Sequence, residues 1–258
     1  MRVRWACVVL MLIGSAWAAP KPDTITLCEE DQDNYPWIIM GRTDYTHVLL
    51  NAVAARTGTR ILIVPKPWIR CLNEMKINAI DGVVNASFSP ERLSMGQYPM
   101  RNGQLDVSRR LLTSRYSLYR LKGSTVNWDG HAFSNVTGPI GAQNSFSIVH
   151  DLREAGVRVD ESSKKIEDLM RYLTLGTVVA VAAQTEAADR VLANHPGYRD
   201  RIEKLPVMLA EKPYYVMFSN RMVAQYPDFT QDVWDTIASV RESAEFSRQI
   251  ESLLGKHP

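Results

Sequence analysis

The chain has 258 residues, of which 45% are hydrophobic and 22% charged, as in a globular protein with a substantial core. Its 30 basic and 28 acidic residues give a formal net charge of +2. Such a balance provides no general electrostatic attraction to DNA, RNA or an anionic membrane. We therefore expect no nucleic-acid partner.

The N-terminus predicts a signal peptide over residues 1–18. Arg2 and Arg4 precede a short apolar run, and small residues then give an A-x-A cleavage pattern ending at Ala18. The apolar run is about half of the ~20 residues that a membrane-spanning helix needs, although an uncleaved anchor helix is the alternative. We therefore expect a mature, soluble protein in the periplasm.

Two cysteines, Cys28 and Cys71, follow the predicted signal peptide. An even number of cysteines in an oxidising compartment predicts a disulfide, and two separately buried thiols are the alternative. Cys28 lies in the first predicted strand, and Cys71 lies one turn into the segment after the second. These points fall on the same edge of a parallel sheet, so we expect their Cα atoms within about 7 Å of each other.

The first half of the chain alternates between strand and helix patterns. Apolar residues at helical spacing predict helices, and short β-branched runs predict buried strands. The predicted order is strand 25–31, helix 45–58, strand 60–65, helix 68–80 and strand 81–87. This order indicates βαβ units and a largely parallel sheet.

A second α/β set follows a long extended segment. Residues 109–123 and 211–219 alternate as extended chain, and no flexible linker separates the two sets. Between and after these segments we expect a strand near 138–143, helices 145–156 and 164–176, strand 177–183, helix 185–195 and one or two terminal helices over 230–256. Serines at the start of the first of these helices are typical N-cap residues.

The order of the segments CEED, YPW, DGVVNASFSPER and GPIGAQNSFSIVHDL resembles bacterial extracellular solute-binding proteins of family 3. This family includes periplasmic receptors for polar amino acids. The resemblance covers nearly the whole mature chain and is most specific over 81–92. It implies an α/β, two-lobed periplasmic-binding fold of type II, with two parallel-rich sheets flanked by helices and a cleft at the hinge.

The resemblance also implies how the chain is divided. Lobe 1 is expected to combine residues 22–113 with the returning tail 212–258, and lobe 2 to span 121–205. The crossing segments 114–120 and 206–211 are the expected hinge. Independently, open α/β sheets bind ligands at the carboxyl ends of their strands, where the strand order reverses.

Arg92 is the first candidate ligand-binding residue. The resemblance implies that the arginine of an S-x-x-x-x-R turn holds a substrate carboxylate, and Ser87 and Arg92 have this spacing. A guanidinium binds a carboxylate through two parallel hydrogen bonds. The alternative is a surface arginine that pairs with Glu91.

The resemblance implies further ligand-binding residues in both lobes. In lobe 1, Trp68 and either Tyr35 or Trp37 are expected to enclose the ligand, with core packing as the alternative. Near the hinge, Tyr116 is expected to reach the cleft, with Tyr119 as the alternative, because side chains alternate along a strand. In lobe 2, the implied ligand-binding residues are Gln143, Ser145 and Ser147, for which ordinary helix capping is compatible with binding.

One position departs from the family pattern. Amino-acid receptors of this family place an aspartate after the apolar strand of lobe 2, where it pairs with the ligand ammonium. Here Gln184 occupies that place, and a neutral amide holds a cation less well than a carboxylate does. Glu186 is an alternative partner if the loop is shifted. We therefore expect a ligand other than an ordinary α-amino acid held at both charged ends.

No catalytic or metal motif accompanies these residues. The five histidines show no paired ligand spacing, so we expect no metal, no cofactor and no enzymatic activity. The expected function is a monomeric periplasmic receptor that captures a small polar, carboxylate-bearing solute for an ABC-type inner-membrane permease. The alternatives are a receptor that serves a membrane sensor, or a dehydratase-like enzyme with Glu186 or Asp31 as its acid or base.

Overall fold

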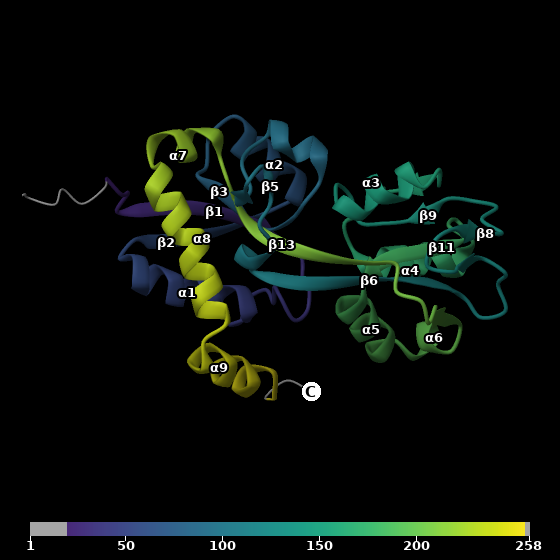
Figure 1. Ribbon diagram of the computed structural model, residues 1–258. Helices are drawn as coiled ribbons and strands as arrows, with labels where there is room; N and C mark the ends of the chain where they lie inside the picture. Colours follow the sequence, from purple (N-terminus) through teal and green to yellow (C-terminus); the bar gives the residue numbers. More distant parts are fainter. Residues whose placement is uncertain (1–19, 256–258) are drawn as a thin grey trace, which may run out of the picture.

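The computed structural model describes residues 20–255. The predicted signal peptide, 1–18, lies outside the described residues. Figure 1 shows two lobes of α/β structure connected by two long strands, as the sequence predicts. Within 20–255, no helix has the length and apolar character that crossing a membrane requires.

The first lobe, here called lobe 1, begins with a parallel three-stranded arrangement. Its first half contains β1 (Thr24–Glu30), α1 (Tyr45–Thr57), β2 (Arg60–Lys66), α2 (Trp68–Lys76), β3 (Gly82–Ser87), η1 (Pro90–Ser94), β4 (Met100–Arg101), β5 (Gln104–Leu105) and η2 (Val107–Arg109). Strand β1 lies between β2 and β3 and is parallel to both. The carboxyl ends of β1 and β3 therefore lie at the same edge of the sheet.

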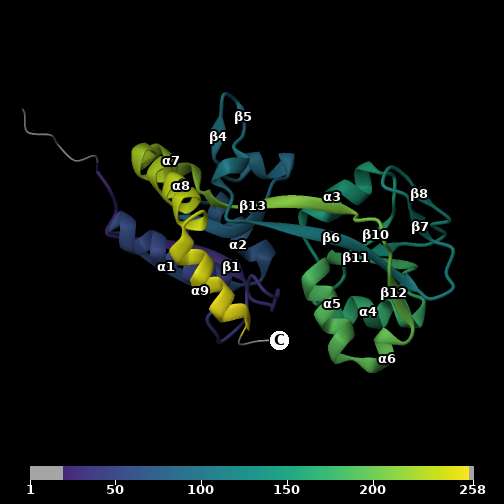
Figure 2. The same cartoon turned by 60° about the horizontal axis from the view of Figure 1, so that its bottom comes forward.

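The end of the chain returns to lobe 1. Helices α7 (Asn220–Gln225), α8 (Pro227–Arg241) and α9 (Ala244–Gly255) follow the last strand, and α8 and α9 pack on α1. Figures 1 and 2 both show α9 beside α1. The rings of Tyr45 in α1 and Phe246 in α9 meet edge to face, with centroids 5.2 Å apart. N- and C-terminal segments thus build one core.

The second lobe, here called lobe 2, comes from the middle of the chain. It contains β7 (Asn127–Trp128), β8 (Phe133–Ser134), β9 (Ile140–Gly141), α3 (Ser147–Glu154), β10 (Val159–Asp160), α4 (Ile166–Leu175), β11 (Ala180–Gln184), α5 (Thr185–Asn194), α6 (Pro196–Arg199) and β12 (Ile202–Lys204). Strand β9 pairs in parallel with β10 and β11.

Two crossing strands connect the lobes by pairing with each other. In β6 (Leu112–Leu121), the first five residues pair antiparallel with β13 (Ala210–Phe218), and the following residues pair with β11 and β12 of lobe 2. The other end of β13 pairs with β3 of lobe 1. The strands therefore form one continuous nine-stranded sheet. Our expectation of two separate sheets was wrong, because β6 and β13 are long enough to pair with strands of both lobes.

Local backbone chemistry sets several element boundaries. Asp44 caps α1 by accepting a hydrogen bond from the His47 amide, and α1 ends where Gly58 adopts a left-handed conformation. Gly82 is required for a different reason, since a Cβ there would lie 2.5 Å from the Met217 carbonyl oxygen of β13. A side chain at this position would push the two strands apart.

Two helices differ from the sequence prediction. Helix α2 ends at Lys76 rather than at residue 80, because Asn78 lies in the left-handed region with φ of 59°. Helix α3 starts at Ser147 rather than at 145, because Ser145 has φ of 61°. The expected serine N-cap is wrong: Phe146 is the N-cap residue, without a side-chain cap.

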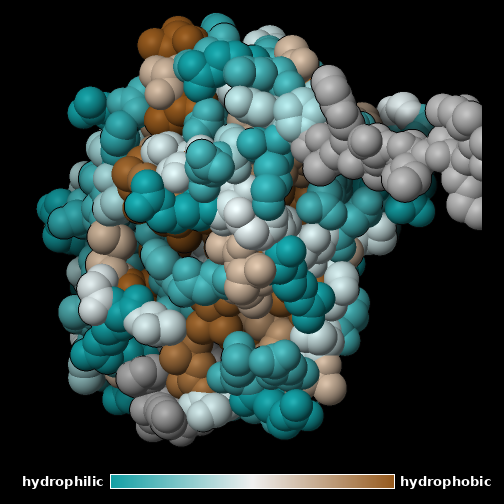
Figure 3. Space-filling view, turned by 90° about the vertical axis from the view of Figure 1, so that its left-hand side faces the viewer, coloured by the Kyte–Doolittle hydropathy of each residue, from teal (hydrophilic) through white to brown (hydrophobic). Residues whose placement is uncertain are grey.

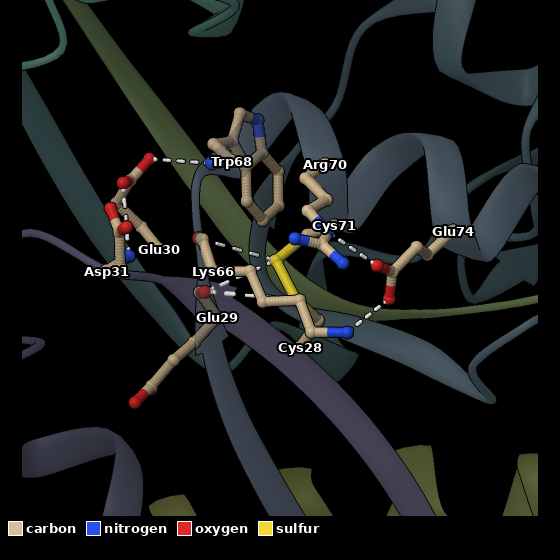
Figure 4. Close-up of a disulfide and its surroundings, with 9 residues drawn as sticks. All are labelled: Cys28, Glu29, Glu30, Asp31, Lys66, Trp68, Arg70, Cys71 and Glu74. Atoms are coloured by element: carbon tan, nitrogen blue, oxygen red, sulfur yellow. Dashed lines mark hydrogen bonds and ion pairs between the residues drawn. A yellow bond between two sulfur atoms is a disulfide. The ribbon is translucent and has the colours of Figure 1, made fainter.

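The disulfide predicted between Cys28 and Cys71 is present, with a Cα–Cα distance of 5.5 Å. It joins β1 to α2 within a buried cluster that includes Trp68 and Met75. Figure 4 shows this bridge beside the end of β1, with Glu30 directed toward the start of α2. The bridge therefore fixes the strand end and the helix start that border the cleft.

The outer face of lobe 1 differs from this interior. Figure 3 shows it to be mainly hydrophilic, with hydrophobic residues at its upper edge and below its centre. Strand β2 is the edge strand of the sheet, and its Leu62 is 42% exposed. Isolated apolar side chains of this kind are normal on a globular surface.

We predict that removing the disulfide lowers stability by about 4 kcal/mol, because the bridge closes a loop with a sequence separation of 43 residues. The double variant Cys28→Ala/Cys71→Ala should show this loss in urea unfolding, compared with the oxidised wild-type protein. The wild-type protein in reductant is the matched control. An unchanged unfolding midpoint in both would show that the bridge does not stabilise the fold.

Candidate functional site

The guanidinium of Arg92 lies between the two lobes. Arg92 follows β3 in η1, and only 2% of it is exposed. Its Nη1 donates to the carbonyl oxygen of Ser87 in lobe 1, and its Nη2 to that of Ser145 in lobe 2, each at 2.8 Å. The guanidinium carbon lies 5.4 Å from the ring centroid of Trp68. One buried charge thus contacts both lobes.

A second direct contact between the lobes lies next to this guanidinium. The hydroxyl oxygens of Ser87 and Ser147 are 2.6 Å apart and form a buried hydrogen bond. Ser87 ends β3, and Ser147 is the first residue of α3. The hydroxyl that the sequence suggested as a helix cap is therefore used across the cleft.

These residues enclose a cavity of about 20 Å³, here called the inner cavity. Among the residues predicted from the sequence, its wall contains Trp68, Ser87, Arg92 and Ser147. The sequence interpretation missed the other wall residues, which are Glu30, Asn34, Ile38, Val84, Asn85, Phe146 and Tyr214. The inner cavity has room for about one water-sized group.

Glu30 is an acid in the wall of the inner cavity. One carboxylate oxygen accepts from the Asp31 amide at 3.1 Å, and the other from the Trp68 amide at 3.2 Å. Burial raises the pKa of Glu30 to about 8. Side chains alternate along a strand, so Glu30 lies on the same side of β1 as Cys28. Since Cys28 was predicted to contact the segment of Cys71, the sequence could also have predicted that Glu30 faces α2.

The three consecutive acids at the end of β1 have different surroundings. Glu29 lies on the opposite side of the strand from Glu30 (Figure 4), and burial raises its pKa to about 7 even though His47 lies nearby. Burial also acts on Asp31, but hydrogen bonds led by that from Lys164 outweigh it and lower its pKa. The Asp31–Lys164 ion pair, at 2.8 Å, is a further contact between the lobes.

A second cavity, here called the outer cavity, lies between the loop after β1 and helices α4 and α5. Its volume is about 580 Å³, and its wall includes the predicted residues Tyr35 and Gln143. The guanidinium of Arg190 in α5 lies over the Tyr35 ring, 4.2 Å from its centroid. Ile38 belongs to the walls of both cavities, so the two adjoin.

The remaining predicted residues lie in neither cavity wall. Trp37 packs edge to face on Tyr45, and Ser145 contributes its carbonyl oxygen rather than its hydroxyl. Tyr116 is buried, with its hydroxyl 2.7 Å from that of Tyr214. Gln184 donates to the same Tyr214 hydroxyl at 2.8 Å. Tyr116 and Gln184 therefore support the hinge strands behind the inner cavity.

Glu186, the alternative to the missing aspartate, is directed elsewhere. Its carboxylate accepts from Arg115 of β6, with the closest contact at 2.7 Å. It belongs to neither cavity wall. The structure thus provides no carboxylate from the start of α5 to the inner cavity.

Comparison with solved structures identifies the fold, whereas comparison with known sequences does not. No family model and no curated protein matches the sequence. Solved structures do match, among them a histidine kinase sensor domain with similarity to periplasmic binding proteins, at 12% identity and a TM-score of 0.71, over 88% of this chain and 94% of that one. The fold is therefore the two-lobed fold of periplasmic binding proteins.

Two further structures match over most of their length. The GluR0 ligand-binding core from Nostoc punctiforme, in complex with L-glutamate, is 14% identical with a TM-score of 0.65, over 90% of this chain and 98% of that one. The arginine-, lysine-, histidine-binding protein ArtJ from Geobacillus stearothermophilus is 16% identical with a TM-score of 0.66, over 92% and 97%. At these identities the likeness concerns the fold.

We predict that Glu30 makes stability depend on pH. Below pH 4.5 this carboxyl is protonated in both states, whereas between pH 4.5 and about 8 only the unfolded chain loses the proton. Stability should therefore fall as the pH rises through this window. Glu30→Gln, which cannot ionise, should gain stability over the wild type by up to ~1.4 kcal/mol per pH unit there.

Urea unfolding at intervals from pH 5 to 8 measures this difference. Glu91→Gln makes the same chemical change at an exposed position and is the matched control. A constant difference between Glu30→Gln and the wild type across this range would show that Glu30 is ionised in the folded protein.

Proposed function

We propose that this protein is a periplasmic solute-binding receptor that captures a small, polar, carboxylate-bearing solute between its lobes. The observation that carries the proposal is the buried Arg92 guanidinium, which lies between the lobes and is bonded to each. A buried guanidinium needs acceptors, and a solute carboxylate is a stronger acceptor than a neutral carbonyl group. The partner of the receptor is an ABC-type permease of the inner membrane.

The solute carboxylate replaces the Ser145 carbonyl oxygen as a partner of Arg92. The Ser87 and Ser147 hydroxyls, which now bond to each other, are free to turn toward the solute when the lobes separate. Trp68 forms the apolar wall. In this proposal the ligand-binding set comprises Arg92, Ser87, Trp68, Tyr35, Gln143, Ser145 and Ser147, with Trp37, Tyr116 and Gln184 as its support.

Lobe movement about the paired crossing strands admits the solute. In this proposal the lobes have the bounds expected from the sequence, 22–113 with 212–258 and 121–205, and the segments 114–120 and 206–211 act as the hinge. A hinge movement of this kind concentrates its dihedral changes in a few residues of the connecting segments, while the packed lobes move as units. The same movement breaks the Arg92–Ser145 and Asp31–Lys164 contacts.

A sensor role is the second candidate, favoured by the likeness to a histidine kinase sensor domain. The dehydratase-like alternative is less favoured by the geometry. Its candidate acids, Asp31 and Glu186, are each held in an ion pair with a basic residue outside the inner cavity. The pKa of Asp31 is lowered, which makes this carboxyl a weak proton donor at neutral pH.

We predict that a thermal-shift screen of amino acids, dicarboxylates and small peptides finds a solute that raises the melting temperature. Arg92→Ala should then weaken its binding by about 30-fold or more in calorimetry, because a charge-assisted partner is lost. Arg92→Lys keeps the charge but not the planar fork, and should bind at least tenfold more weakly than the wild type.

Arg70→Ala removes an exposed arginine from α2 and is the matched control, with unchanged binding expected. Circular dichroism confirms that each variant is folded. Wild-type affinity in folded Arg92→Ala would contradict the proposed anion site. Turnover of the solute found in the screen would favour an enzyme instead.

A further inference from the structure

The outer cavity is large enough to take part of the solute. Its volume of about 580 Å³ lies within the range of ligand sites in proteins, whereas the inner cavity measures about 20 Å³. Ile38 is part of both walls, so the two cavities lie on either side of its side chain. A solute that is longer than the group held at Arg92 would have to pass Ile38 to reach the outer cavity.

Gln143 presents a buried acceptor in the wall of the outer cavity. It is 3% exposed, and its Nε2 donates to the Lys164 carbonyl oxygen at 3.0 Å. This bond fixes the orientation of the amide, because a carbonyl oxygen accepts only from the NH₂ group. The Oε1 atom has no hydrogen-bond partner among the described residues. A buried oxygen of this kind requires an N–H or O–H donor.

Acidic residues of lobe 1 face a wall of mixed charge in lobe 2 across the outer cavity. The loop of lobe 1 contributes Asp31 and Asp33, and the wall from lobe 2 contributes Lys164, Lys165, Glu167, Asp168 and Arg190. Asp31 is paired with Lys164, and Asp168 bonds to Ser163 and Arg171. Asp33 accepts from the Met40 amide and has no ion pair within residues 20–255. Its exposed carboxylate is therefore available to an ammonium group.

The inner cavity, by contrast, offers no ionised acid for an ammonium group beside the carboxylate. Gln184 is neutral and bonds to Tyr214. Both oxygens of Glu30 accept main-chain amides, and its burial favours the neutral form. A solute with its ammonium next to its carboxylate would therefore leave that ammonium poorly paired.

We infer that the solute is a short peptide, with its carboxylate at Arg92, an amide N–H donated to Gln143 Oε1 and its ammonium beside Asp33. This inference rests on the proposed function and names the substrate class. It assigns the outer cavity to the peptide beyond its C-terminal residue, where main-chain groups are recognised. Because these contacts involve only the main chain of the peptide, a peptide with small side chains is sufficient to test them.

Alanine, dialanine and trialanine test the inference, since they differ only in length. Calorimetry on the full mature protein should show binding of dialanine or trialanine at least tenfold tighter than that of alanine. Asn194→Trp fills the outer cavity from α5 and should weaken peptide binding at least tenfold. Ala193→Trp, at the exposed neighbouring position outside the wall, is the matched control and should leave it unchanged.

Two further variants test the contacts. Asp33→Asn should weaken peptide binding about fivefold or more, and Gln143→Leu at least tenfold. Because Gln143 is buried, binding by Gln143→Leu is interpreted only if the melting temperature of this variant matches that of the wild type. Asp33 and Asn194 are exposed, so variants at these two positions test the inference even if Gln143→Leu does not fold.

Alanine binding as tight as that of the peptides would overturn the inference, as would wild-type peptide affinity in Asn194→Trp. If none of the three probes binds while the wider screen finds an amino acid or dicarboxylate whose binding needs Arg92, the short-peptide inference fails and the proposed function stands. If no solute binds at all, both fail.

Discussion

A single buried positive charge organises the contact between the lobes. The Arg92 guanidinium is removed from water, and such a charge is tolerated only where acceptors surround it. Those acceptors are main-chain oxygens of Ser87 and Ser145, which belong to different lobes. Because main-chain oxygens cannot turn away as side chains do, separation of the lobes must leave Arg92 without one partner. The hydrogen bonding of Arg92 therefore depends on how the two lobes are arranged.

Much of the architecture follows from patterns that the sequence displays locally. The periodicity of 45–58 predicts α1, the run ended by Pro65 predicts β2, and both agree with the structure within a residue or two. The pairing of Cys28 with Cys71 follows from the compartment and from parallel-sheet geometry. The family resemblance carried by the S-x-x-x-x-R turn implied that Ser87 and Arg92 act together, and both lie in the wall of the inner cavity. In each case the signal lies within one supersecondary unit.

What the sequence did not reveal depends on contacts between distant segments. The hydroxyl of Ser147 bonds to Ser87, 60 residues away, so an apparent helix cap became a contact between lobes. Phe146 and Tyr214 enter the wall of the inner cavity only after the lobes and crossing strands assemble. The single sheet has the same origin, since the length of β6 and β13 decides which strands each can reach. Local periodicity contains no information about such partners.

The pairing of β3 has a consequence for how the chain folds when it emerges N-terminus first. Strand β3 lies between β1 and β13, yet β13 begins at residue 210 and so emerges long after β3. Until then β3 is an uncovered strand edge, and α1 lacks the helices α8 and α9 that pack on it. All the elements of lobe 2 precede β13 in the chain, so that lobe can fold earlier. Lobe 1 thus begins with the first elements of the chain but is completed only by the last ones. In the interval the free edge of β3 is exposed to wrong strand pairing.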